Sequence, residues 1–216
     1  MAQAELLVFL DDAQYSKNSY INRVQIDAGG TARWLTVPVS YRFGDAINRV
    51  RPADSQWRQA HLDMLKSYYS GAAEFPAVYG WMSELYSSLP DADLAAGNRF
   101  LIKAVAEKLG IVCHYKNSSE IDTGGAAGDD RLIVILRSLG PDVAYLSGKG
   151  GANYQGPGKF EAAGIALKYS EFVHPAYTQG HAEFLPGLSV FDALFRAGFD
   201  GTAALIASSR KTKPVS

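Results

Sequence analysis

The sequence has little that would suit an oxidising compartment. It contains one cysteine, Cys113, so no disulfide can form within the chain. Small secreted domains usually depend on several disulfides. The start of the sequence also lacks the basic region and the apolar stretch of a secretory signal peptide. We therefore expect a reduced, cytoplasmic protein.

Long hydrophobic runs and an excess of one charge are also absent. The chain has 21 Lys and Arg residues against 22 Asp and Glu residues, which gives a net charge of −1. This balance provides no positive field for nucleic acid or for an anionic membrane. A membrane-spanning helix needs about 20 apolar residues, and the apolar runs 5–10, 100–115 and 131–136 are too short or are interrupted by charges. We expect no nucleic-acid partner and no membrane partner.

What is present is enough apolar sequence for one sizeable core. The chain has 216 residues, 47% of them hydrophobic, which predicts a single α/β domain over 1–216. After Gly110, strand-like and helix-like segments alternate, and this alternation predicts a β-α-β-α-β unit with a mostly parallel sheet. The predicted segments are the strands 111–115, 143–146 and 165–169 and the helices 130–139 and 157–163. The fold class is therefore α/β, a Rossmann-like three-layer sandwich.

The first half of the chain predicts a strand followed by helices. Residues 5–10 form an apolar run typical of a buried strand. Residues 13–27 predict a loop, Gly29 and Gly30 a turn, and residues 34–39 a short edge strand. Helical spacing over about 55–109 predicts a helical insertion of three helices. A last helix is expected from Ser189 to Gly198, followed by a flexible tail at 208–216.

The loop after the predicted strand 143–146 is a candidate anion site. It carries Ser147, Gly148, Lys149 and Tyr154 among several glycines. In an open parallel sheet, ligands bind beyond the carboxyl ends of strands, where glycines let backbone N–H groups approach an anion. The loop matches neither the G-x-G-x-x-G nor the P-loop pattern. A functional loop and a merely flexible turn both remain open.

A second candidate lies directly after the first strand. Asp11 and Asp12 can bind a cation or act as general acid and base, or they can cap a turn. Because consecutive side chains of an extended chain point to opposite sides, we expect one of the two to be functional and the other structural. The polar segment that follows carries Lys17, Asn18 and Arg23, which could clamp a sugar or a phosphate. A solvated loop is the simple alternative.

Other reactive side chains are interpreted as structural. The cluster of His174, His181 and Glu183 does not have a common zinc-ligand spacing, and Pro175 and Gly180 indicate a loop, so no metal is predicted. His61 is expected to pack in a helix interface. Cys113 has no neighbouring base and is not predicted to be a nucleophile. No cofactor can be assigned from the sequence.

Five segments carry a resemblance to a known family. They are residues 8–23, Trp34 to Pro38, Tyr145 to Gly148, the Tyr177-x-Gln179 pair, and residues 188–198 with Asp192. In this order they resemble the WbqC-like protein family. The resemblance implies a bacterial cytoplasmic protein that is encoded with surface-polysaccharide, O-antigen or natural-product genes. It also implies aminoacyl or acyl transfer to an activated amino sugar.

One segment typical of that family has no counterpart in this sequence. Members usually begin with a strand and a His-Gln-Pro-x-Tyr-x-Pro-Trp motif ahead of the segment that matches residues 7–12. By resemblance, that motif lies in the active site. The activity of this form is therefore left open, and we expect an exposed sheet edge that lowers its stability or favours a homodimer.

The resulting prediction is a transferase that acts on a nucleotide-activated amino sugar or a related small molecule. Lys17 and Arg23 would hold a phosphate or carboxylate, and the loop 147–151 would donate backbone N–H groups to an anion. Asp12, Tyr177 and Gln179 would orient the acceptor or move its proton. The predicted substrate-binding residues are Asp11, Lys17, Asn18, Arg23, Ser147, Gly148, Lys149, Tyr154 and Asp192, although Asp192 could instead support neighbouring residues.

Two other functions remain open at this point. The aromatic residues of the predicted helices and the absence of a recognised nucleophile motif favour a non-catalytic scaffold for a sugar-pathway enzyme. A hydrolase or ligase that uses ATP is the weaker alternative, because the sequence has no phosphate-binding fingerprint.

Overall fold

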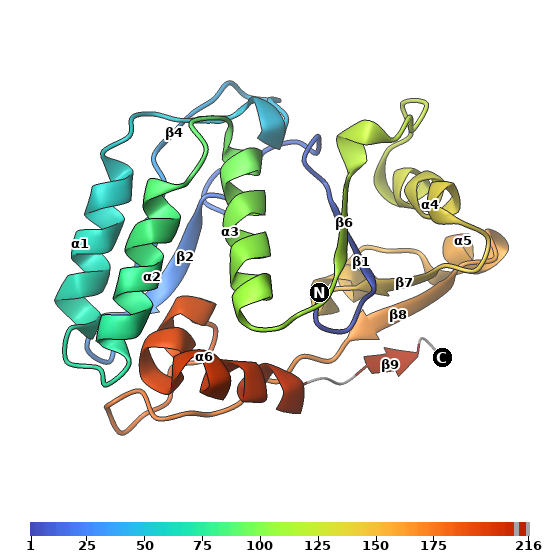
Figure 1. Cartoon of the computed structure of the whole chain (residues 1–216). Helices are drawn as coiled ribbons and strands as arrows, with labels where there is room; N and C mark the ends of the chain where they lie inside the picture. Colours follow the sequence, from blue (N-terminus) through green and yellow to red (C-terminus); the bar gives the residue numbers. More distant parts are fainter. Residues whose placement is uncertain (210–211, 215–216) are drawn as a thin grey trace. The chain divides into compact units, whose positions relative to one another are not determined.

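The computed structural model describes residues 1–209 and the backbone of 212–214. These residues form a mixed α/β structure with six α-helices and several short sheets (Figure 1). The chain divides into two compact units. Unit 1 contains residues 1–10, 113–173 and 209 onward, and unit 2 contains residues 11–112 and 174–208. The single domain predicted from the sequence stays a prediction.

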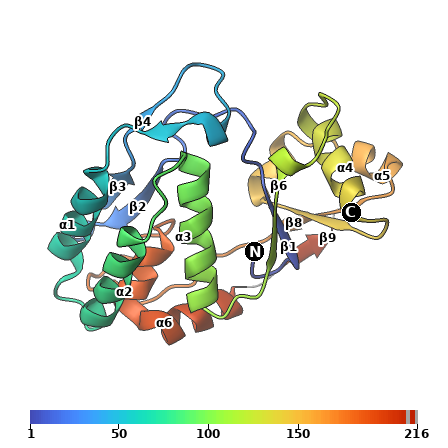
Figure 2. The same ribbon diagram turned by 45° about the horizontal axis from the view of Figure 1, so that its top comes forward.

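Unit 1 contains two parallel strand pairs. β1 (Leu6–Phe9) pairs with β6 (His114–Asn117), and β7 (Ala144–Ser147) pairs with β8 (Ala166–Ser170). Helix α4 (Gly128–Leu139) connects β6 to β7, and helix α5 (Pro157–Ala162) connects β7 to β8 (Figure 1 and, from another side, Figure 2). The predicted β-α-β-α-β order is therefore confirmed. The core of the unit consists of Ile133, Leu136, Phe160, Ile165 and Leu167.

The parallel strands of unit 1 do not form one continuous sheet. Among the described residues, β1 and β6 are a two-stranded sheet, and β7, β8 and β9 (Thr212–Pro214) are a separate one, with β9 antiparallel to β8. The Rossmann-like three-layer sandwich is thus not confirmed. β6 also begins three residues after the predicted position, because the N–H of Ile111 still bonds to the carbonyl of Ala106 in the preceding helix.

Unit 2 is built around a hairpin. β2 (Arg23–Asp27) pairs antiparallel with β3 (Ala32–Thr36), and the predicted turn at Gly29 and Gly30 joins them with φ angles of 72° and 90°. Such positive φ angles suit glycine. The sequence analysis missed β2 because Arg23, Gln25 and Asp27 give it a polar composition. Its alternate residues Val24 and Ile26 nevertheless face the core.

Helices cover this hairpin. The three predicted helices are present as α1 (Trp57–Tyr69), α2 (Phe75–Ser87) and α3 (Leu94–Lys108). α3 begins after Asp93, whose carboxylate accepts the N–H of Ala96, which is the usual way to cap a helix. Short elements join the hairpin to the helices: β4 (Val39–Ser40), the 3₁₀ turn Ile47–Arg49 and β5 (Arg51–Pro52). The core includes Ile26, Leu35, Leu65, Tyr69, Val78, Met82, Leu194 and Phe195.

The last helix of unit 2 is longer than predicted. α6 runs over Val190–Ser208 and breaks at Gly198, where φ is 69°. The predicted end at Gly198 is therefore a kink, after which the helix resumes. Ser208 still belongs to α6, and Thr212–Pro214 forms β9. Residues 210–211 and 215–216 of the predicted flexible tail lie outside the described residues. No helix in the described part of the chain is long and apolar enough to span a membrane.

His61 is a buried packing residue, as predicted. Its Nε2 lies 2.9 Å from the carbonyl oxygen of Thr36, so this nitrogen carries the proton and donates. Its Nδ1 then accepts from the hydroxyl of Tyr86 at 3.2 Å. Burial lowers the pKa of His61 from its ordinary 6.5, against the opposing effect of the Thr36 bond. The native protein therefore holds a neutral imidazole that fixes α1 to β3.

This burial predicts acid sensitivity. Below pH 6.5 the unfolded chain binds a proton at His61 that the native state does not. The free energy of unfolding therefore decreases as the pH is lowered, by up to about 1.4 kcal/mol per pH unit. His61→Gln removes this slope and costs about 1–3 kcal/mol at pH 8 through weaker hydrogen bonding. Urea unfolding between pH 5 and 8 measures both effects. His114→Gln, at an exposed position, is the control. An unchanged slope in His61→Gln would contradict the assignment.

Candidate functional site

The structure places the predicted site residues in both units. Ser147, Gly148, Lys149 and Tyr154 belong to unit 1, and all the others belong to unit 2. Three of the residues in unit 2, Tyr177, Gln179 and Asp192, meet at one point.

A buried carboxylate, that of Asp192 in the first turn of α6, brings these three residues together. Asp192 is 0% exposed. Its Oδ2 accepts from the hydroxyl of Tyr177 at 2.6 Å and from Nε2 of Gln179 at 3.3 Å. Its Oδ1 accepts from the hydroxyl of Tyr69 at 2.8 Å. The side-chain amide of Gln179 also bonds to both backbone groups of Leu185. The segment from 177 to 185 is thereby fastened to α6 and α1.

A second buried carboxylate, that of Asp27, lies at the end of β2. Its Oδ2 accepts from Arg196 at 3.0 Å and lies 3.1 Å from Nε2 of His181, while its Oδ1 accepts from the N–H of Gly30 at 2.7 Å. The backbone N–H of Asp27 donates to the hydroxyl of Tyr69 at 3.0 Å. Tyr69 therefore joins the two carboxylate centres. We call these seven residues the carboxylate network: Asp27, Tyr69, Tyr177, Gln179, His181, Asp192 and Arg196.

The sequence analysis missed part of this network. Asp27, Tyr69 and Arg196 were not candidate residues, and His181 was considered only as a metal ligand. One usable signal was Asp27 ahead of Gly29 and Gly30, because an aspartate in a turn often accepts a backbone N–H two or three residues later. Tyr69 and Arg196 gave no local signal, because their partners lie far away in the sequence.

The electrostatics of the network fix the protonation of its phenols. Burial raises the pKa of Tyr177, and the neighbouring carboxylate of Asp192 raises it further. Burial and Asp192 also raise the pKa of Tyr69. Both phenols therefore keep their protons at neutral pH and donate to Asp192. The hydroxyl of Tyr177 donates its hydrogen to Asp192 in this state, and its raised pKa makes it a weak acid.

The network predicts a large effect of one substitution. Asp192→Ala leaves the buried hydroxyl of Tyr69 and the half-buried hydroxyl of Tyr177 without their acceptor, and the amide of Gln179 loses one of its two acceptors. An unsatisfied buried polar group costs about 1–3 kcal/mol, so we expect the free energy of unfolding to fall by at least about 2 kcal/mol. Tyr177→Phe removes one of these bonds and should cost less. Asp200→Ala, at an exposed position of the same helix, is the matched control. Urea unfolding at pH 7.5 measures all three, and equal stability of the three variants would refute the network.

The predicted binding loop after β1 is only partly exposed. Asp11 is buried and forms an ion pair with Arg99 at 3.2 Å, which is a structural contact. Asp12 is half-buried and Lys17 is exposed. The guanidinium of Arg23 donates to the carbonyl of Asn18 and lies 4.0 Å from the centre of the Trp34 ring. Lys17 is therefore more accessible to a ligand than Arg23.

In the candidate loop of unit 1, close packing requires a glycine at one position. Ser147 is buried at the end of β7, and the 3₁₀ turn Lys149–Asn153 follows. A Cβ atom on Gly151 would collide with the side chains of Ser147 and Gln155. Gly148 and Lys149 are exposed, and Tyr154 is 76% exposed. The glycine content of this loop is thus explained in part by close packing.

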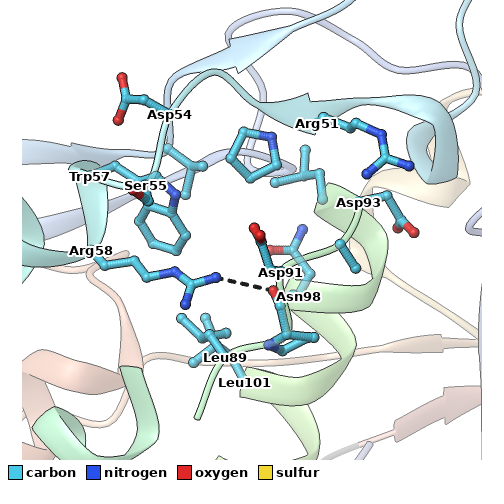
Figure 3. A pocket seen from close by; sticks show the side chains of 16 residues that line it. Arg51, Asp54, Ser55, Trp57, Arg58, Leu89, Asp91, Asp93, Asn98 and Leu101 are labelled. Carbon is cyan, nitrogen blue, oxygen red and sulfur yellow. Dashed lines mark hydrogen bonds between the residues drawn. The ribbon is translucent and has the colours of Figure 1, made fainter. Parts of the chain in front are cut away.

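Unit 2 contains a pocket of about 320 Å³ that none of the predicted site residues lines (Figure 3). Trp57 and Arg58 at the start of α1 lie on one side of it, and Arg51 and Asp93 lie on the other. Nη2 of Arg58 donates to the carbonyl of Pro90 at 3.1 Å. The lining residues with polar or aromatic side chains are Arg51, Asp54, Ser55, Trp57, Arg58, Asp91, Asp93 and Asn98.

The wall of this pocket also holds the loop after β1. Asn98 lines the pocket, and its Nδ2 donates to the carbonyl of Ile21 at 2.7 Å. Val37 lines it too, and its carbonyl accepts from Nδ2 of Asn22 at 3.0 Å. The predicted binding loop is therefore anchored at the pocket. Sequence reasoning missed the pocket because its lining residues come from separate segments between Val37 and Leu101.

Comparison with known proteins identifies the family. The profile of the WbqC-like protein family matches residues 1–204. The chain belongs to this family. It is 28% identical over 201 residues to the uncharacterized protein Rv1507c of Mycobacterium tuberculosis (strain ATCC 25618 / H37Rv), covering 92% of this chain and 86% of that protein. No solved structure matches the chain.

The resemblance segments of this WbqC-like protein fall in different units. Tyr177, Gln179 and Asp192 form the centre of the carboxylate network in unit 2, whereas Tyr145 to Gly148 lies in unit 1. In the part of the chain that the structure describes, no group of three His, Cys, Asp or Glu side chains is arranged to hold a metal ion.

Proposed function

We propose that this WbqC-like protein is a transferase that moves an aminoacyl or acyl group to a nucleotide-activated amino sugar or a related small molecule. We further propose that the pocket of unit 2 binds the activated sugar. The proposed setting is the biosynthesis of a surface polysaccharide or a natural product.

The incomplete hydrogen bonding of the Arg58 guanidinium is the main support for the proposal. Its Nε is buried and has no hydrogen-bond partner, although Nη2 donates to Pro90. An unsatisfied buried donor costs about 1–3 kcal/mol, which a bound anion would recover. Guanidinium groups also match the geometry of a phosphate, to which they can donate two parallel hydrogen bonds. Arg58 and Arg51 are therefore suited to hold a diphosphate in this pocket.

The other lining groups suit the sugar. The indole of Trp57 offers an apolar face, and the carboxylates of Asp54 and Asp91 can accept from hydroxyl groups or from an amine. Lys17 is exposed on the loop that Asn98 and Asn22 anchor to the pocket wall, and it is our candidate for a further cation that contacts the phosphate. This combination of cations, carboxylates and one aromatic ring favours an activated sugar over an apolar ligand.

The proposed reaction forms an amide. The amine of the sugar attacks the acyl carbonyl, the bond between the acyl group and its donor breaks, and the amine loses one proton. Asp12 is our candidate base for that proton, because it is half-buried on the anchored loop. The contacts of Tyr177 and Gln179 favour a positioning role, since both donate to a fully buried carboxylate. The loop 147–151 stays a separate candidate for an anion.

Ligand binding tests the proposal. We expect nucleotide-activated amino sugars to raise the thermal midpoint of the protein by several degrees at about 100 times the dissociation constant. In isothermal titration, Arg58→Ala should weaken binding about 10- to 100-fold, because a charge-assisted hydrogen bond contributes about 1.5–3 kcal/mol. Arg42→Ala is the matched control, since Arg42 is exposed and does not line the pocket. Equal affinity of the two variants for the ligand would show that the ligand does not bind in this pocket.

Turnover separates the transferase from the scaffold alternative. A transferase consumes an acyl donor in the presence of the activated sugar, and the product gains the mass of the acyl group. Asp12→Asn should lower this rate while sparing the affinity for the sugar. Binding without turnover over a range of acyl donors would favour the scaffold.

A further inference from the structure

Helix α3 contains a glycine at a position where alanine would give a more stable helix. Gly97 is the fourth residue of α3, and its N–H donates to the carbonyl of Asp93 at 3.2 Å, as an ordinary helical residue does. Glycine inside a helix is less favourable than alanine, because its backbone loses more conformational freedom on folding. The choice of glycine at this position therefore needs a physical reason.

Two structural reasons for a glycine do not apply to Gly97. The residue is not one of those with a positive φ angle, so its backbone conformation does not require glycine. Among the described residues, apart from its chain neighbours and the backbone of its own helix, no atom lies within 4 Å of the place where a Cβ atom would be. Packing against other side chains therefore does not require glycine either. The reason that remains is the close approach of a ligand to the backbone.

The pocket of unit 2 provides the place for such a ligand. Gly97 lines this pocket of about 320 Å³ together with Leu94 and Leu101. These three residues are spaced by three and four positions, so they lie on one face of α3. The two leucines thus flank a stretch of bare helix backbone. A ring that enters the pocket can lie in van der Waals contact with the helix at Gly97.

The polar residues of the same segment suit an amino sugar. Asp93, which caps α3, and Asn98, which follows Gly97, both line the pocket (Figure 3). The oxygen atoms of their side chains can accept from hydroxyl groups or from an amine. Arg58, the main candidate for holding the diphosphate, belongs to α1 and lies on the other side of the pocket from Asp93. The sugar therefore matches the surface of α3 better than the diphosphate does.

We propose that Gly97 is a specificity-determining residue of this pocket, where its bare backbone lets the ring of the amino sugar lie against α3. This inference rests on the proposed function, since it requires an activated amino sugar in the pocket of unit 2. A Cβ atom at residue 97 projects into the space of the ring and displaces the sugar. The nucleoside diphosphate keeps its contacts with Arg58. The glycine thus lowers the stability of α3 and leaves room for the ligand.

The substitution Gly97→Ala tests the proposal through two measurements. Without ligand, the variant should have a thermal midpoint about 1–4 °C higher, because alanine is the better helix former and meets no neighbour. In isothermal titration with UDP-glucosamine, it should bind at least about 10-fold more weakly, since one extra carbon in a filled pocket has an effect of this size. The affinity for UDP, which lacks the sugar, should stay nearly unchanged.

Gly80→Ala is the matched control. Gly80 lies inside α2 of the same unit, is exposed and also has open space at its Cβ position, but it does not line the pocket. This variant should show the same rise of the thermal midpoint. Its affinity for both probes should equal that of the unaltered chain.

The outcomes separate this inference from the proposed function. Unchanged affinity of Gly97→Ala for UDP-glucosamine, alongside a loss in Arg58→Ala, would overturn the inference and leave the pocket assignment intact. Equal losses of affinity for UDP-glucosamine and UDP would overturn it too, because the sugar would then not lie at Gly97. So would a lower thermal midpoint of Gly97→Ala, which would show that the space is not open. If the unaltered chain binds neither probe, or Arg58→Ala binds both normally, the proposed function fails and this inference fails with it.

Discussion

The arrangement of β2, α1 and α6 in unit 2 depends on the hydroxyl group of Tyr69. It accepts the N–H of Asp27 from β2 and donates to the carboxylate of Asp192 in α6. Its ring stacks on Phe195, with 4.5 Å between the ring centroids. Buried carboxylates are stable only when each is paired or fully hydrogen-bonded, so Asp27 and Asp192 require their partners in fixed positions. The phenol of Tyr69 thereby ties β2 to α6, and Asp192 ties the segment 177–185 to the same point.

This constraint reaches the pocket through helix α1. Tyr69 ends the helix and Trp57 begins it, about 18 Å away at 1.5 Å per residue. His61, between them, bonds to Thr36 of β3. The helix is therefore held against the hairpin both near its middle and at its end, and this fixes where Trp57 and Arg58 lie. Tyr177 and Gln179 bond to Asp192 near Tyr69, at the end of α1 opposite to Trp57. Their contacts therefore favour a role in positioning α1 over direct contact with a ligand in the pocket.

Local patterns predicted the elements of the fold better than their assembly. The spacing of apolar residues located the three helices between 57 and 108, and the order of strands and helices after residue 113 was also predicted. β2 was missed because only Val24 and Ile26 are apolar in it. The separation of the parallel strands into two sheets could not be predicted, because strand pairing depends on contacts between distant segments and not on local spacing.

The same distinction holds for the candidate site. The resemblance motif contained Tyr177, Gln179 and Asp192, and the structure brings them within hydrogen-bond distance of one another. Tyr69 lies 123 residues from Asp192, and no local pattern could connect the two. The pocket around Arg58 was missed for a related reason: its charges come from β5, α1 and the start of α3, and each is an ordinary surface residue in its own segment.

The path of the chain adds a constraint on both units. The chain passes between them after residues 10, 112, 173 and 208, so neither unit is one contiguous segment. The helices between 57 and 108 do not complete unit 2, because Tyr69 and Asp27 need Asp192, His181 and Arg196 from the later segment. Contacts of this sequence separation form late and slowly in folding, since the intervening loop must close first. The carboxylate network, together with the core packing of α6, joins the two segments of unit 2.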